Sequence, residues 1–450
     1  MTRDLTVGKP MGLILSFALP TLFGMLFQQF YNMVDTMIVG KLLGANALGA
    51  VGSTGAICFF VIGFCMGLCN GFAIPVAQRT GAGDGRNMRR FVANSAYLCL
   101  FFSAVLTVGT TLGCRWILRV MQTPVELFED AYEYIFIMFL GIPVIILYNM
   151  LSGIIRSLGD SKTPVYFLAL SSVLNIVLDF AFILCFRAGV AGAALATVIS
   201  QGVSGVACLV FMRKRYPQLR MTPEERRFDL SVCKVLCGMG IPMGLQYSIT
   251  AIGSIIMQSA VNTLGSLCVS AVAAANKLSQ LLCCPFDALG ATMATYCGQN
   301  VGALKLDRLG KGIGSAVFVG AVYSTLSLGI MLLFAEECTM LFLSPSEPQL
   351  DLLIRLTVQY ILINAAFFLA LTILNVVRFS IQGMGFSNLA IISGVLEMIA
   401  RTAMGQWMVP AYGYAAACFG SPIAWMSAIV FLIPACMGCI RHLRKTYITS

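Results

Sequence analysis

The sequence predicts an all-α polytopic membrane protein, in which twelve transmembrane helices form two parallel-repeat six-helix bundles. The first observation behind this prediction is composition: 58% of the 450 residues are hydrophobic, only 11% are charged, and the mean hydropathy is +0.87. A soluble domain is nearer half apolar and a quarter charged. The other two observations are the number of long apolar runs and an internal repeat.

The apolar runs are long enough to cross a bilayer, which takes about 20 residues per helix. The twelve runs are approximately 11–39, 50–77, 91–113, 130–155, 163–186, 189–212, 232–261, 268–297, 312–334, 352–377, 386–409 and 413–440. Almost no polar sequence is left for a soluble domain. The N-terminal segment has no small-residue cleavage site, so we expect no removable signal peptide.

The basic residues predict the orientation in the membrane. With the N-terminus inside, 22 Lys and Arg residues fall on the cytoplasmic side and 5 on the other side. The larger number includes Arg156 and Arg378, each of which we place in a cytoplasmic loop. This bias predicts a multi-pass membrane protein with both termini in the cytoplasm. The net charge of +10 is thereby explained without a nucleic-acid partner.

Two halves of the chain resemble each other at an offset of 221 or 222 residues. The matches are Ala18-Leu-Pro20 with Gly240-Ile-Pro242, Gln78-x-x-Gly-Ala82 with Gln299-x-x-Gly-Ala303, and Arg156 with Arg378. We therefore predict an N-lobe at 1–212, a cytoplasmic linker at 213–231 and a C-lobe at 232–450. Six spans per repeat give both halves the same orientation, a transporter plan in which substrate is handled between the halves.

Polar residues inside the predicted spans mark the candidate site. An acid in the hydrocarbon core costs several kcal/mol unless it is partnered, protonated or facing water. Asp35 lies in the first span, Asn175 and Asp179 share one face of the fifth span, and Thr197 lies in the sixth at compatible depth. These four residues predict an oxygen-rich pocket that holds Na⁺ or shares a proton between two acids. The competing interpretation is that they only hydrogen-bond helices together.

The C-terminal half carries a different pair at the matching positions. The offset of 222 maps Asn175 to Glu397 and Asp179 to Arg401, which are four residues apart and in the favourable order for an ion pair on one helix. A self-neutralised pair is a poor ion carrier, so we place ion coupling in the N-lobe. For Glu397 and Arg401 we predict a structural or gating role.

The sequence offers no set of residues for enzyme chemistry, so we predict that the protein is not an enzyme. His442 is the only histidine, and no nucleotide-binding loop is present. The 17 cysteines lie mostly in apolar runs and are expected to pack as small hydrophobes. Cys436, Cys439 and His442 make only half of a zinc site. We expect no cofactor, no bound nucleotide and an ion gradient of H⁺ or Na⁺ as the driving force.

Five motifs give the chain a resemblance to a known family over essentially its whole length. They are Tyr31-Asn-Met-Val-Asp35-Thr, Gly40-Lys-Leu-Leu-Gly44, Gln78-Arg-Thr-Gly-Ala-Gly-Asp84, Leu174-Asn175-x-x-x-Asp179 and Gly298-Gln-Asn-x-Gly-Ala303. With them the chain resembles the multidrug and toxic compound extrusion (MATE) family of secondary antiporters. The resemblance implies a V-shaped cavity and rocker-type export of organic cationic or amphipathic compounds against Na⁺ or H⁺.

The same resemblance implies roles for individual residues. Asp35, Asn175, Asp179 and Thr197 match the family's N-lobe cation and proton site, and Gln28, Tyr134 and Asn149 fall on cavity-lining positions. Several branches of the family carry a glutamate in the seventh helix, but the seventh span here (241–261) has no acid. This difference favours the bacterial DinF/MepA-like branch, so the resemblance implies a bacterial cytoplasmic (inner) membrane.

The sequence thus predicts a multidrug exporter that works as a monomer in the lipid bilayer by alternating access. The main alternative is a flippase for lipids or lipid-linked oligosaccharides of the related two-lobe type. Such a protein is expected to have a strongly basic cavity, whereas the bases that we place deep in the membrane are only Lys277 and Arg401, against four acids. A membrane-embedded enzyme is a second alternative, and the sequence lacks the nucleophile–base pair or metal set that it needs.

Overall fold

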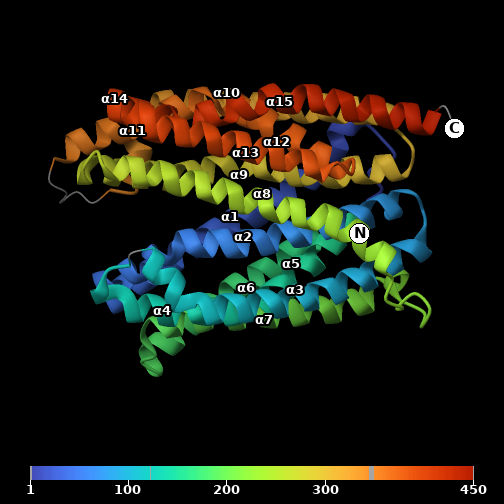
Figure 1. Ribbon diagram of the computed structural model, residues 1–450, viewed down its shortest axis with the longest axis horizontal. Helices are drawn as coiled ribbons and strands as arrows, with labels where there is room; N and C mark the ends of the chain where they lie inside the picture. The colour runs from blue at the N-terminus through green and yellow to red at the C-terminus, as the bar shows by residue number, and fades with distance from the viewer. Residues whose placement is uncertain (1–2, 122, 344–348, 449–450) are drawn as a thin grey trace. The chain divides into compact units, whose positions relative to one another are not determined.

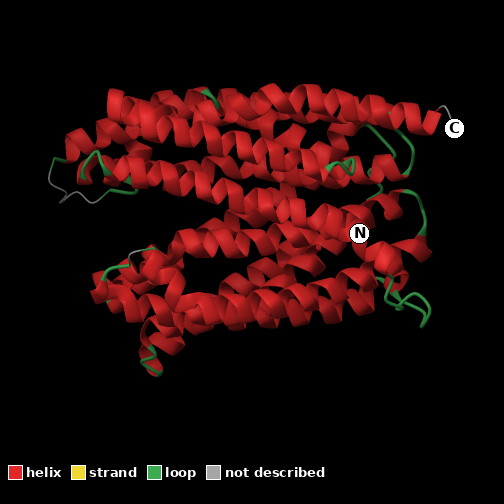
Figure 2. Cartoon of the chain, viewed as in Figure 1, coloured by secondary structure: helices red, strands yellow, loops and turns green. Residues whose placement is uncertain are grey.

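The fold is helical throughout the part of the chain that can be described. The computed structural model describes residues 3–121, 123–343 and 349–448, and Figure 2 shows helices joined by short loops with no strand in these ranges. Long apolar helices satisfy every backbone N–H and C=O internally, which the hydrocarbon core requires. The predicted all-α class is confirmed.

The N-terminal helices follow the predicted spans closely. They are α1 (Pro10–Leu43), α2 (Ala45–Gly81), α3 (Gly85–Val120), α4 (Val125–Leu140), α5 (Ile142–Ser157), α6 (Lys162–Phe180), the π-helix η1 (Ala181–Cys185) and α7 (Gly189–Arg215). A short 3-10 turn, η2 (Pro217–Leu219), lies in the predicted linker. Helices α4 and α5 meet at an angle of 47° and together form one span.

The C-terminal helices repeat this order. They are α8 (Leu230–Asn262), α9 (Ser266–Gly302), α10 (Asp307–Met340), α11 (Leu350–Ala366), α12 (Phe368–Gly383), α13 (Ser387–Ala403), the π-helix η3 (Met404–Met408), α14 (Val409–Tyr412) and α15 (Tyr414–Ile448). Within the described ranges, nine single helices and the two bent pairs α4–α5 and α11–α12 are long and apolar enough to span a membrane. Helix α13, continued without a break by η3 and α14, is the twelfth span.

The chain forms two compact units. Unit 1 contains 3–4 and 23–248, and unit 2 contains 5–22 and 249–448 of the described residues. Helices α1 and α8 are each divided between the units, and Figure 1 shows the helices of each unit running side by side along their length. The predicted lobe limits follow the repeat in the sequence and stay a prediction; the compact units are cut within α1 and α8 instead.

Glycines explain why the first half of α8 belongs to unit 1. Gly67 and Gly71 on α2 face Gly240 and Gly244 on α8, so each helix presents two glycines four residues apart. A Cβ atom on Gly67 would lie 2.6 Å from the Met243 carbonyl oxygen and 2.8 Å from the Gly244 Cα. Small residues at this spacing let two membrane helices pack backbone against backbone. The contact therefore tolerates no side chain at Gly67.

Matching geometry in the two halves confirms the repeat and corrects one of its matches. Gly44 and Gly265 take the same positive-φ, extended-ψ conformation before α2 and α9, at the predicted offset of 221. In the loops after α5 and α12, Gly159 and Gly385 match with positive φ, and their N–H groups donate to the Arg156 and Gln382 carbonyls. Arg156 thus matches Gln382, and the predicted match with Arg378 is wrong by one helical turn.

The linker is fastened to the start of α3 in unit 1. Arg89 donates two hydrogen bonds to Glu225, at 2.6 and 2.9 Å, and Arg90 pairs with Asp229. The Asn94 side chain donates to the Arg227 carbonyl and accepts from the Asp229 N–H at 2.8 Å. Because Arg89 stabilises the charged form of Glu225, the pKa of that carboxyl falls to about 2.

We predict that Gly67→Ala destabilises unit 1. The added Cβ atom meets backbone of α8, which cannot rotate away, and overpacking of this kind costs about 1–3 kcal/mol. The thermal unfolding temperature of the purified protein in detergent measures the effect. Gly55→Ala on the same helix is the matched control, because a Cβ atom there meets nothing within 4 Å. Equal unfolding temperatures for the two variants would contradict the packing described.

We predict a pH-dependent effect of Glu225→Gln. The lowered pKa means that the carboxylate stabilises the folded protein above its ordinary pKa near 4.5, and that this stabilisation is lost as the pH falls toward 2. The variant should therefore unfold at a lower temperature than the wild type at pH 7, and the difference should shrink by pH 3. Glu224→Gln is the control, since its ion pair with Arg86 is exposed and screened by water.

Candidate functional site

The two acids of the predicted site meet inside unit 1. Asp35 lies on α1 and is half-buried, whereas Asp179 lies on the last turn of α6 and is fully buried. Their carboxyl groups face each other within hydrogen-bonding range. The Oδ1 atom of each acid is buried and receives no hydrogen bond from the part of the chain that the structure describes. The site thus holds two acceptor oxygens without donors.

Asn175 and Thr197 join the acids, as the sequence predicts, but in a supporting position. The Asn175 amide is satisfied when its Nδ2 donates to Asp179 Oδ2 at 3.0 Å and its Oδ1 accepts from the Thr197 N–H at 3.1 Å and hydroxyl at 3.2 Å. The Thr197 hydroxyl also lies 3.1 Å from the Ala193 carbonyl of its own helix. The amide therefore fixes Asp179 against α7.

Tyr31 completes the site, and sequence reasoning gave it no role. Its hydroxyl is in hydrogen-bonding range of Thr197, and the ring lies close to both acids. The signal was present in the sequence, because Tyr31 precedes Asp35 by four residues and shares its helix face. Tyr31 was quoted only as part of a motif.

The three predicted cavity residues of unit 1 lie on different helices. Gln28 on α1, Tyr134 on α4 and Asn149 on α5 are all half-buried. Tyr134 lies within electrostatic range of Asp35 and Asp179, so it belongs with the acids. The Asn149 amide donates to the Ile145 carbonyl of its own helix at 2.8 Å. Their role as a substrate cavity stays a prediction.

The acid pair limits the chemistry that the site can perform. Two facing carboxylates repel each other unless they share a proton or a cation lies between them. The described residues contain no group of three or more His, Cys, Asp and Glu side chains placed to hold a metal ion. A cation here would therefore take its charged ligands from Asp35 and Asp179 alone. The geometry suits the reversible uptake of one positive charge.

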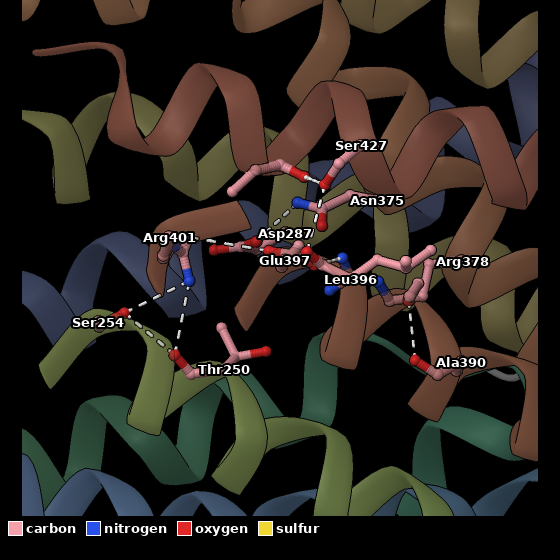
Figure 3. A network of polar contacts seen from close by, with 12 residues as sticks. Thr250, Ser254, Asp287, Asn375, Arg378, Ala390, Leu396, Glu397, Arg401 and Ser427 are labelled. Carbon is pink, nitrogen blue, oxygen red and sulfur yellow. Dashed lines mark hydrogen bonds and ion pairs between the residues drawn. The ribbon is translucent and has the colours of Figure 1, made fainter. Parts of the chain in front are cut away.

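Unit 2 contains a second buried polar network, shown in Figure 3. The Glu397 carboxylate on α13 pairs with Arg378 of α12 and, at 3.7 Å, with Arg401 one turn along its own helix. Arg401 also reaches the Thr250 carbonyl and the Ser254 hydroxyl on α8, both at 3.5 Å. Glu397, Arg378 and Arg401 are only 2%, 5% and 8% exposed.

A neighbouring pair extends this network. Asn375, one turn before Arg378 on α12, donates to Asp287 of α9 at 2.9 Å. The Asp287 side chain is exposed and lies within electrostatic range of Arg378. Figure 3 shows Glu397 between Arg378 and Arg401, with Asp287 beside it.

The network corrects two sequence-based expectations. The predicted ion pair between Glu397 and Arg401 is present, but it is not self-neutralised, because Arg378 adds a second positive charge. Arg378 is a buried residue within α12 and not a loop residue, so it does not belong in the cytoplasmic count. Without Arg378, the excess of Lys and Arg residues still lies strongly on the cytoplasmic side. Arg378 was misplaced because the predicted span ended one residue before it.

Comparisons with known proteins agree with this architecture. The MatE family model matches residues 20–181 and 242–407. The probable multidrug resistance protein YpnP of Bacillus subtilis is 32% identical over 301 residues, which cover 66% of this chain and 67% of YpnP. YoeA of the same organism, also a probable multidrug resistance protein, is 29% identical over 74% of this chain and 73% of its own.

Among solved structures, an outward-facing multidrug resistance MATE family transporter has a TM-score of 0.90. The alignment covers 99% of this chain and 100% of that chain, at 23% sequence identity. At this level of identity the likeness concerns the fold.

We predict that Asp179→Asn stabilises unit 1 at pH 8. The amide can donate to the Asp35 Oδ1 atom, which accepts nothing in the wild type, and one of two facing charges is removed. A hydrogen bond of this kind contributes about 1 kcal/mol. The unfolding temperature in detergent should rise more than in Asp179→Ala, which supplies no donor. Glu133→Gln, at an exposed position on α4, is the control, and a rise no larger than its own would contradict the facing geometry.

Proposed function

The chain belongs to the MatE family, and we propose that it is a secondary-active exporter of organic cationic or amphipathic compounds, with H⁺ or Na⁺ as the coupling ion. The observation that carries the proposal is the facing pair of Asp35 and Asp179 with two buried oxygens that lack donors. Membrane proteins keep such acids where an ion or proton must be taken up and released. The relatives named as multidrug resistance proteins support the substrate class.

The mechanism follows from the charge of this pair. With both acids ionised, the site attracts a cation, and uptake of one coupling ion neutralises the repulsion between them. We propose that the ion enters from outside and that its binding favours release of the substrate outward. The two acids are held facing each other, while their charge changes, by the side chains of Asn175, Thr197 and Tyr31.

Several finer features belong to the same proposal. The bacterial relatives support a bacterial inner membrane, and the charge bias of the loops supports cytoplasmic termini. We further propose that the protein works as a monomer, needs no cofactor, and performs no enzymatic reaction. Drugs and the lipid bilayer are then its partners, and nucleotides and nucleic acids are not.

A flippase for lipids or lipid-linked oligosaccharides remains the second candidate, and one observation now favours it more than the sequence did. The sequence placed Lys277 and Arg401 alone as bases within the membrane. The structure adds Arg378, buried beside Arg401. Competition with dye export by a lipid-linked sugar, but not by organic cations, would support this candidate.

The deciding experiment imposes Na⁺ and pH gradients separately on proteoliposomes that contain the purified protein and a fluorescent organic cation. We predict that one of the two gradients drives dye movement and that Asp35→Asn abolishes it, because the remaining acid has no facing carboxylate with which to share the ion. Glu133→Gln should transport as the wild type does. Full gradient-driven transport by Asp35→Asn, with normal incorporation into the vesicles, would sink the mechanism.

A further inference from the structure

The network in unit 2 places two guanidiniums against a single carboxylate at ion-pair distance. A guanidinium stays protonated at any physiological pH, so Arg378 and Arg401 are two fixed positive charges. Among the residues that the structure describes, Glu397 is the one carboxylate in ion-pair contact with either. An uncompensated buried charge costs several kcal/mol. Asp287 is a second carboxylate near Arg378, within electrostatic range of that guanidinium, and its Oδ1 accepts from Asn375; among the described residues it makes no ion pair with Arg401.

The two arginines also retain unused donors. The Nε atom of Arg378 is buried and has no hydrogen-bond partner within the described residues. Arg401 holds Glu397 at 3.7 Å and its two oxygen partners on α8 at 3.5 Å. Charge-assisted hydrogen bonds are normally about 2.7–2.9 Å. The contacts of Arg401 are therefore longer than normal hydrogen bonds. Because Arg401 is only 8% exposed, water can replace few of these contacts.

The network extends to an exposed residue of α8. Ser254, whose hydroxyl contacts the Arg401 guanidinium, is exposed. Gly253 beside it lies against the Arg401 side chain, where a Cβ atom would be 3.4 Å from the Arg401 Cδ. A Cβ atom there would also lie 3.2 Å from the Met398 Cα, so Gly253 lets α8 pack closely against α13 beside Arg401. Figure 3 shows the Arg401 guanidinium directed toward Thr250 and Ser254, away from Arg378.

From these observations we propose that unit 2 contains an anion subsite, in which Arg401 binds a carboxylate or phosphate group, and Glu397, which also pairs with Arg378, occupies Arg401 when that group is absent. The inference rests on the proposed function and adds that compounds with an acidic group as well as an apolar or cationic part bind more tightly than purely cationic ones. An anion that binds Arg401 gives this guanidinium a partner of its own, in place of the carboxylate that it shares with Arg378. A purely cationic compound gains no binding energy from Arg401.

A purely structural role for the network makes different predictions. A clamp between α12 and α13 needs one arginine for one carboxylate, and the second arginine would then add only desolvation cost. A structural network would also be indifferent to the charge of the transported compound. The two interpretations can therefore be separated by a pair of ligands that differ only in an acidic group.

The test uses a fluorescent xanthene dye with a free carboxylate and the methyl ester of the same dye. Fluorescence anisotropy measures the binding of each dye to the purified full-length protein in detergent. We expect tighter binding of the carboxylate dye to the wild type. Arg401→Gln should weaken its binding about tenfold, the value of one charge-assisted hydrogen bond, and change binding of the ester less than about twofold.

Two further variants guard against misfolding as the explanation. Glu397→Gln removes the internal occupant of the arginines and should strengthen binding of the carboxylate dye, a gain that a damaged protein cannot produce. Lys277→Gln is the matched control, because it removes an exposed base of α9 outside the network. The proposal is overturned if Arg401→Gln weakens both dyes equally, if Glu397→Gln weakens the carboxylate dye, or if the wild type does not prefer that dye over its ester.

The lipid composition distinguishes the two sources of the acidic group, a lipid headgroup and a solute. Binding is repeated in nanodiscs of phosphatidylcholine alone and of phosphatidylcholine with phosphatidylglycerol. Competition by phosphatidylglycerol assigns the group to a lipid headgroup, and lack of competition assigns it to a solute; both outcomes support an anion subsite. Anisotropy needs no gradient, so it measures binding of the carboxylate dye without the transport step. Failure of gradient-driven transport would thus leave the subsite testable, and failure of binding would leave the transport proposal standing.

Discussion

The structure depends on one constraint, which is that a charge inside a membrane protein must be matched by another charge, a proton or a ligand. Backbone groups meet the same constraint through unbroken helices, but side chains must meet it one by one. Unit 1 buries negative charge at Asp35 and Asp179, and no base among the described residues pairs with either acid, so a cation or proton has to complete the site. Unit 2 instead buries two guanidiniums around one carboxylate, Glu397, with Asp287 near Arg378.

This opposition arises within a repeated scaffold. In both halves a bent helix pair precedes a helix that ends in a five-residue π-helix, η1 after α6 and η3 after α13. Insertions of this kind are common at functional sites because they re-aim the side chains of the preceding turn. Asp179 lies on the turn before η1 and Arg401 on the turn before η3. The same π-helical insertion therefore follows an acid in unit 1 and a base in unit 2.

The sequence predicted what depends on composition and local spacing. Apolar length identified all twelve spans, and the rarity of intramembrane charge identified Asp35, Asp179, Glu397 and Arg401. It did not predict what depends on tertiary contact. Arg378 lies one residue past an apolar run, where a loop base and a buried base look alike, and only the position of Glu397 across the helix interface separates them. The division of α8 between the units likewise depends on the glycine contact with α2.

The two sites together suggest why both arginines persist in a chain whose spans are otherwise almost free of base. If the coupling ion binds only at the acids of unit 1, a purely cationic substrate competes with it there for the same negative charge. A substrate that is also held by an acidic group at Arg401 has binding energy that the coupling ion cannot displace directly. Exchange must then act through a change of conformation rather than through competition for one site, which is what alternating access requires.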